Sequence, residues 1–148
     1  MRDRVTKHKA TKRFDVELFI VHPTLDPSAI QAALGLSAKV VHRAGSPRKT
    51  PQGRPLSGTY PDTRWRYSRR YETHGQHFAE ETVALLDKLE PNKAFLKDLR
   101  SSGGTASLLI QFLGDGYFGD EIPIAILQRM INLELDFAIE CFVVPQKP

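Results

Sequence analysis

Two hydrophobic periodicities alternate along this chain, and together they restrict it to a fold that combines strands and helices. Patterns typical of strands, with apolar residues at alternate positions or in short runs, cover 14–21, 63–73, 106–113 and 135–144, with a shorter one at 39–42. Patterns typical of helices lie at 26–34, 75–90, around 95–99, and 122–133. This order predicts an α+β fold, a two-layer sandwich in which helices pack on one face of a mainly antiparallel or mixed sheet of four to five strands.

The first and last parts of this pattern resemble each other. Each contains an apolar strand, an acid and a proline at the start of a short helix, and then Leu34-Gly35-Leu36 or Leu133-Glu134-Leu135. The likeness predicts two pseudo-repeated strand–helix–strand halves. A chain of 148 residues is one domain by length. We therefore expect a single α+β domain at 13–148, preceded by a disordered basic tail at 1–12.

Positive charge is concentrated in one part of the chain. The segment 41–71 holds eight lysines and arginines and one acid, Asp62, although the whole chain carries a net charge of only +4. Charge sorted in this way indicates an electrostatic partner rather than a fold. The basic residues of the segment are Arg43, Arg48, Lys49, Arg54, Arg64, Arg66, Arg69 and Arg70.

The basic segment divides into a loop and a strand. Residues 44–62 contain four prolines and three glycines, which predicts a long loop, and loops of this length are usually functional or mobile. In the strand that follows, Trp65, Tyr67 and Tyr71 are predicted to face the core and the alternate arginines to face outward. Arg69 breaks the alternation and predicts a bulge or a frayed end.

We expect the outward arginines and the loop to form one contact face. Its predicted residues are Arg43, Arg48, Lys49, Arg54, Arg64, Arg66 and Arg70. The favoured hypothesis is a non-catalytic binding module for an acidic partner protein, in an immunity-like or regulatory role, because arginine binds carboxylates through a planar fork. Nucleic acid is the alternative partner, since the aromatics could stack on bases. The acidity of the C-terminal half argues against a large phosphate footprint.

An enzyme with a His/Glu site is the third hypothesis. His74, His77 and Glu81 have the spacing to share one helix face, as metal ligands or acid–base groups would require. However, the H-E-x-x-H order of zinc peptidases is absent, and a helix start favours glutamate through the helix dipole. The chain has no G-x-S-x-G motif, and Thr59 replaces the lysine that a phosphate loop needs after Gly53-x-x-x-x-Gly58. We therefore predict no cofactor, no metal and no catalytic residue.

The remaining features concern the cellular location. The single cysteine, Cys141, excludes an internal disulfide, and its apolar surroundings predict a small buried core residue. No apolar stretch of secretory type follows the basic N-terminus, and the most apolar helical stretch, 122–127, falls well short of the roughly 20 residues of a membrane span. We expect a soluble cytoplasmic protein without membrane contact.

The order of several short motifs resembles a known family. These motifs are Leu25-Asp26-Pro27-x-x-Ile30, Leu34-Gly35-Leu36, Arg43-x-Gly45 with Pro47-Arg48, Trp65 on a strand after a variable loop, Leu86-x-x-Leu89-Glu90-Pro91, Gly116-Tyr117-Phe118, and Leu133-x-Leu135-Asp136-Phe137-x-Ile139. Over roughly 14–142 the chain is similar to the bacterial family catalogued as domain of unknown function 4279. It departs from the family where Cys141 and Phe142 stand near the usual position of a tyrosine. The resemblance implies the fold and a small bacterial cytoplasmic protein, but no activity and no catalytic residues.

Overall fold

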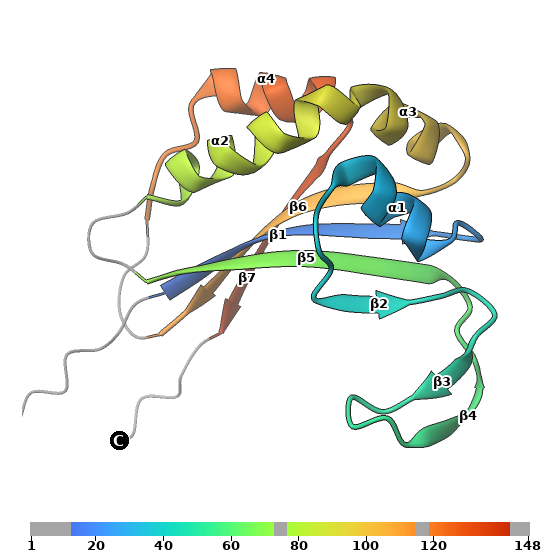
Figure 1. The fold of residues 1–148 in the computed structure, drawn as a ribbon. Coiled ribbons are helices and arrows are strands. Elements are labelled where there is room, and N and C mark those ends of the chain that lie inside the picture. Colours follow the sequence, from blue (N-terminus) through green and yellow to red (C-terminus); the bar gives the residue numbers. More distant parts are fainter. Residues whose placement is uncertain (1–12, 73–76, 115–118, 143–148) are drawn as a thin grey trace, which may run out of the picture.

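The computed structural model describes residues 13–72, 77–114 and 119–142. Its elements form two layers, a mixed five-stranded sheet and a layer of helices on one side of it (Figure 1). This arrangement confirms the predicted α+β sandwich. The predicted tail at 1–12, His74 and the motif 116–118 lie outside the described residues. The elements of the two layers are β1 (Arg13–His22), α1 (Pro27–Leu34), β2 (Val40–His42), β5 (Thr63–Glu72), α2 (Phe78–Leu89), the short 3₁₀ helix η1 (Glu90–Asn92), α3 (Lys93–Ser101), β6 (Thr105–Leu113), α4 (Ile124–Asn132) and β7 (Asp136–Phe142).

The sheet is built around β1, in the strand order β2-β5-β1-β6-β7. β1 pairs antiparallel with β5 and β6, β2 pairs antiparallel with β5, and β7 pairs parallel with β6. Consequently β1 and β2 run in the same direction on either side of β5, as the adjacent strands β6 and β7 do. Both β1–α1–β2 and β6–α4–β7 are therefore strand–helix–strand units with parallel strands, in agreement with the predicted pseudo-repeat.

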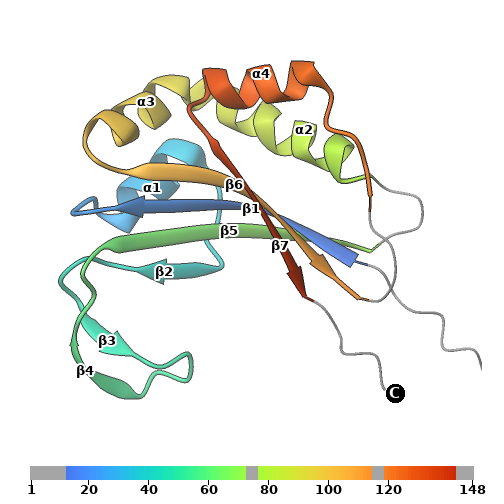
Figure 2. The same ribbon diagram turned by 180° about the vertical axis from the view of Figure 1, so that it is seen from behind.

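The core lies between the sheet and the helices. Alternate residues of β1, from Phe14 to Ile20, point toward the helices and are buried, and leucines of α2 and α3 meet them from the other side. Fully burying a leucine or isoleucine side chain contributes roughly 1.5–3 kcal/mol. Figure 2 shows the same layers from behind, with the helices above the sheet and β7 in the foreground. Within the described residues no helix is long and apolar enough to cross a membrane.

The predicted inward and outward sides of β5 are confirmed. Trp65 is fully buried, and Tyr67 and Tyr71 pack against the core. Arg69 faces the same side but stays exposed, with its guanidinium 5.4 Å from the centre of the Tyr71 ring. The pairing with β1 continues without interruption to Glu72, so the predicted bulge or frayed end at Arg69 is wrong.

The predicted loop at 44–62 is instead largely a hairpin. Strands β3 (Pro47–Lys49) and β4 (Pro55–Thr59) pair antiparallel in a separate two-stranded sheet that projects beyond β2 (Figure 1). Both strands begin with a proline, a position that proline tolerates because no ladder bond is lost there. The intervening turn is closed by Gly53, whose φ of 83° is open to glycine and whose N–H donates to the Thr50 carbonyl at 2.8 Å. Proline and glycine therefore shape this ribbon rather than prevent it.

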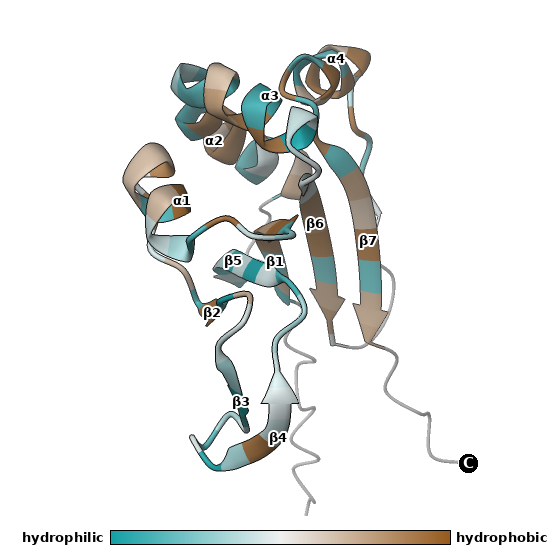
Figure 3. Ribbon diagram, turned by 90° about the vertical axis from the view of Figure 1, so that its right-hand side faces the viewer, coloured by the Kyte–Doolittle hydropathy of each residue, from teal (hydrophilic) through white to brown (hydrophobic). Residues whose placement is uncertain are grey.

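The prediction that Cys141 is buried is also wrong. β7 is the outermost strand on its side of the sheet, and Cys141 is exposed on it. Figure 3 shows β7 at the edge of the molecule, beside β6 and below α4. The apolar run that suggested burial belongs to a strand that the helix layer covers only in part.

Candidate functional site

The outward arginines of β5 are bound to acids of the neighbouring central strand. Arg70 donates through Nε and Nη2 to the two carboxylate oxygens of Asp15, at 2.8 and 3.0 Å. The Asp15 side chain is 1% exposed, whereas that of Arg70 is 45% exposed. Hydrogen bonds to Asp15, followed by its charge, raise the pKa of Arg70. Arg70 is therefore a surface cation whose side chain also covers a buried carboxylate.

Arg66 forms a second contact of this kind. Its Nε lies 3.4 Å from Oε2 of Glu17, which is buried two residues after Asp15 on the same face of β1. The guanidinium carbon also lies 4.8 Å from the centre of the Phe19 ring. Oε2 of Glu17 makes no hydrogen bond within the described residues, and its contact with Arg66 is an ion pair. Arg66 therefore contacts a buried carboxylate and the face of an aromatic ring at the same time.

Two more of the predicted arginines have acids of their own at the surface. Arg64 donates from Nε to Asp62 at 2.9 Å, and Arg43 lies 2.8 Å from Asp26. Asp26 is the N-cap of α1, and its carboxylate also accepts from the backbone N–H and the hydroxyl of Ser28. The backbone bond from Ser28 is the largest cause that lowers the pKa of Asp26, and Arg43 contributes a smaller effect. Four of the seven predicted contact residues are therefore paired within the chain.

The other three predicted residues, Arg48, Lys49 and Arg54, lie on the β3–β4 hairpin. All three are exposed, and their side chains form no ion pair with any described residue. The stretch 44–61 contains no acid, so no negative side chain within the hairpin offsets them. We call these three residues the hairpin cations. The predicted contact face thus has two parts. The arginines near or on β5 are paired with acids of the chain, whereas the hairpin cations have no acid partner among the described residues.

Tyr60 fixes the hairpin against the main sheet. Its ring stacks on the imidazole of His42 in β2, with 4.2 Å between the ring centres and 7° between the planes. Its hydroxyl accepts from the Lys49 N–H at 3.1 Å and lies 3.3 Å from the Lys49 carbonyl, to which it donates. At the base, Thr63 accepts from the N–H of Ala44 and donates to the carbonyl of Leu25. The hairpin cations are therefore carried by an anchored ribbon.

Only part of the predicted His/Glu site lies within the described residues, where His77 and Glu81 have different partners. His74 lies outside the described residues, and Nδ1 of His77 is 3.6 Å from Asp120. Asp120 also accepts from the N–H of Ala79, so it caps the start of α2 from a distant part of the chain. Glu81 bonds to the Tyr71 phenol instead. No group of three or more His, Cys, Asp or Glu side chains in the described ranges is placed to hold a metal.

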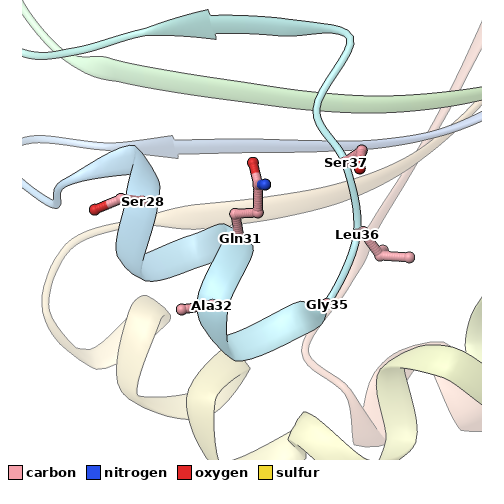
Figure 4. A pocket seen from close by; sticks show the side chains of 6 residues that line it. All are labelled: Ser28, Gln31, Ala32, Gly35, Leu36 and Ser37. Atoms are coloured by element: carbon pink, nitrogen blue, oxygen red, sulfur yellow. The ribbon is translucent and has the colours of Figure 1, made fainter.

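A surface depression of about 500 Å³ lies at the C-terminal end of α1. Figure 4 shows that the Gln31 side chain extends from α1 on the side where Ser37 lies, whereas the Leu36 side chain points away from α1. The residues that line it are Ser28, Gln31, Ala32, Gly35, Leu36 and Ser37. None of them carries a titratable side chain or a charge. The lining residues supply hydroxyls, from Ser28 and Ser37, but no side chain that could act as a general acid or base.

Sequence reasoning missed the acids that neutralise β5. Asp15 and Glu17 alternate with the apolar residues of 14–21 in the same way as the arginines alternate with the aromatics of 63–73. Two strands with opposite charges on their polar faces are candidates for pairing with each other. That signal could have suggested an internal ladder, but only the register shows that Asp15 lies opposite Arg70.

Comparison with known proteins gives a family match and nothing closer. The family model described as "Domain of unknown function (DUF4279)" matches residues 9–142, which is most of the chain. Neither the curated proteins nor the solved structures include one that matches.

Proposed function

Because this chain belongs to the DUF4279 family, whose description assigns no activity, we propose a function from its own surface. We propose that it is a non-catalytic binding module that contacts an acidic partner protein through the β3–β4 hairpin. The hairpin cations carry this contact, whereas Arg43, Arg64, Arg66 and Arg70 are already paired within the chain. A regulatory or immunity-like role would use such a contact.

The observation that carries this proposal is the contrast between the two groups of cations. An arginine bound to its own acid must lose that acid before it can bind a partner fully, whereas the hairpin cations lose only water. They lie on a ribbon that projects beyond the sheet, so a partner can reach them without meeting the helix layer (Figure 1). Charges of this kind mainly raise the association rate and set the salt dependence of binding.

Nucleic acid remains the second candidate, because a two-stranded ribbon has the dimensions to enter the major groove of DNA. The charge count favours a protein partner. A site that neutralises Z phosphates weakens with salt at a slope of about −0.9Z, and a protein with roughly 6–10 phosphate contacts loses about 10³–10⁵ in affinity between about 50 and 200 mM salt. The described hairpin supplies three unpaired cations.

The test compares two triple charge reversals in capture of partners from the native cell lysate. R48E/K49E/R54E changes the hairpin cations, and K88E/K93E/K97E changes three exposed lysines of α2 and α3 that form no ion pair with a described residue. Both variants alter the net charge equally. We expect the first to abolish capture of an acidic protein at low salt and the second to retain it.

A direct binding measurement completes this test once the captured protein is purified. The hairpin variant should associate at least about ten times more slowly at low salt, and the difference should shrink at high salt. Equal association rates for the two variants would remove the hairpin from the interface. Capture of nucleic acid instead of protein, lost in the hairpin variant alone, would favour the second candidate.

We further propose that the partner is met in the bacterial cytoplasm. Cys141 is the sole cysteine of the chain and is exposed as a free thiol. The cytoplasm keeps thiols reduced, whereas secreted proteins form and retain disulfides. The free thiol therefore supports a cytoplasmic location. Fractionation of the native cells tests this location.

A further inference from the structure

The outer edge of β2 lies next to the hairpin cations. β2 is the first strand in the order of the sheet, and among the described strands only β5 pairs with it. An edge strand leaves the backbone N–H and C=O groups of alternate residues without a strand partner. Figures 1 and 2 show that the β3–β4 hairpin projects from the end of β2 on the side away from β5. A chain that ran along this edge would therefore pass beside the hairpin.

The chain around this edge carries positive charge only. Residues 27–61, which include α1, β2 and the hairpin, contain five bases and no acid. Arg43 is paired with Asp26, whereas Lys39 and the hairpin cations form no ion pair with a described residue. Lys39 directly precedes β2, and its backbone N–H donates to the Arg66 carbonyl at 2.7 Å. Unpaired cations thus precede and follow β2 in the chain.

The two valines of β2 are exposed and lie on opposite faces of the sheet. Val41 is 47% exposed and lies opposite Trp65, on the helix side. Val40 is 41% exposed and lies opposite Arg66, on the side without helices. The side chains of a strand added beside β2 alternate between these two faces. Apolar residues of such a strand therefore contact one valine, while the residues between them are free to carry charge.

We propose that the partner binds through an extended acidic segment that adds as a strand to the outer edge of β2. Its backbone pairs with β2, and its carboxylates meet Lys39 and the hairpin cations. This inference rests on the acidic partner proposed above and names the element of that partner that binds. Strand addition obtains affinity from backbone hydrogen bonds and specificity from alternate side chains. Because β2 has only three residues, few backbone bonds form, and the charges are needed as well.

The same charges argue against other occupants of this edge. Lysine beside an edge strand normally opposes pairing with further strands. A second copy of the chain that paired through its own β2 would bring two sets of cations together, and a basic segment would be repelled in the same way. A nucleic acid would neutralise the cations but has no peptide backbone to pair with β2. An extended acidic segment satisfies both the strand edge and the cations.

The first test compares two synthetic peptides of equal length by fluorescence anisotropy at neutral pH. One repeats Val-Glu, and the other repeats Pro-Glu, which carries the same charge but lacks the backbone N–H at every second residue. We expect the full chain to bind the Val-Glu peptide at least about ten times more tightly. R48E/K49E/R54E should abolish this binding, and K88E/K93E/K97E should retain it. Equal affinities for the two peptides, or no binding of the Val-Glu peptide, overturn the proposal.

Amide hydrogen exchange of the wild-type chain locates the bound peptide without any substitution. The amides of β2 that face its outer edge should exchange at least about ten times more slowly when the Val-Glu peptide is bound. The Pro-Glu peptide should leave them unchanged. β7, at the other edge of the sheet, is the internal control and should show no change with either peptide. Protection of β7, or no protection of β2, overturns the proposal.

The outcomes separate this inference from the proposed function. If capture from the lysate depends on the hairpin cations but both peptides bind equally, the acidic partner stands and its contact is not an added strand. If capture does not depend on the hairpin cations, the proposed function fails, and this inference fails with it. Duplex DNA that binds the wild type but not R48E/K49E/R54E, together with no binding of the Val-Glu peptide, would favour nucleic acid and overturn both.

Discussion

Arg70 on β5 binds both carboxylate oxygens of Asp15 on β1, at 2.8 and 3.0 Å, in a strand pair where the two residues lie directly opposite each other. Asp15 is buried on the side of the sheet away from the helices, and Arg70 covers it. A residue whose charge suggested an external partner is therefore required inside the molecule. Its removal should change stability, which makes the two roles distinguishable.

The first prediction compares two arginines of one strand. Arg70→Ala leaves the buried carboxylate of Asp15 without its partner and should lower the free energy of unfolding by about 2 kcal/mol. Arg64→Ala breaks a pair with the more accessible Asp62 and should cost less than about 1 kcal/mol. Both changes remove one positive charge from the same face of β5. Urea unfolding followed by far-ultraviolet circular dichroism measures both, and equal losses would show that burial of Asp15 does not matter.

The second prediction concerns the anchor of the hairpin. Tyr60→Ala removes the stack on His42 and the bonds to the Lys49 backbone, so the hairpin should open more often while the main sheet stays folded. Trypsin cleaves after lysine and arginine unless a proline follows, so the bond between Arg54 and Pro55 resists it, and we expect cleavage after Arg48 and Lys49 to accelerate at least about tenfold.

Leu56→Ala is the control for this experiment. Leu56 lies on the same hairpin and is exposed, and no ring contact or side-chain hydrogen bond connects it to the sheet within the described residues. Its cleavage rate should match the wild type. If Tyr60→Ala leaves the cleavage rate unchanged, the backbone pairing of β3 and β4 holds the hairpin without Tyr60.

The elements that the sequence predicts well are those with strong local periodicity. The pleat of a strand forces alternate side chains to opposite faces, so Trp65 and its alternating arginines could be assigned to faces before the fold was known. The same reasoning fails for Cys141, because an apolar run indicates a strand and does not say whether another strand covers its edge. The β3–β4 hairpin was predicted as a loop for a different reason. Its prolines and glycines are typical of loops, and only their placement at strand starts and turns permits a ribbon.

The sequence predicted which basic residues belong to the candidate site. It did not predict which of them are paired with acids of the same chain and which are free to bind a partner. Arg70 and Asp15 are separated by 55 residues, and their contact follows from the register of two strands. No local pattern specifies that register. The hairpin cations differ from Arg64, Arg66 and Arg70 of β5 in having no acid partner among the described residues, which is a property of the folded chain.

The third prediction uses the phenol of Tyr71. Burial, and then the neighbouring Glu81, raise the pKa of Tyr71 from 10.0 to about 12. Below pH 10 the phenol is protonated in both states, so its contribution to stability is fully present. Between about 10 and 12 the unfolded chain releases this proton while the folded chain retains it, so the free energy of unfolding falls as pH rises.

Tyr71→Phe isolates this effect from the other titrating groups. The wild type should lose stability more steeply than Tyr71→Phe between about pH 10 and pH 11.5, as measured by urea unfolding at each pH. The tyrosinate absorbance of the folded wild type should show one phenol that titrates near 12 and is missing in the variant. Parallel stability curves for the two proteins would contradict the raised pKa.

The last prediction tests the packing of the single tryptophan. Trp65 is fully buried opposite Ile20, and its indole N–H has no hydrogen-bond partner within the described residues. Trp65→Ala should lower the free energy of unfolding by about 4 kcal/mol, because it leaves a large cavity in the core. Trp65→Phe keeps most of the apolar contact and also removes a buried donor that costs about 1–3 kcal/mol when unsatisfied. We therefore expect Trp65→Phe to cost only about 1 kcal/mol, and a cost close to that of Trp65→Ala would mean that the indole N–H is bonded in the folded protein.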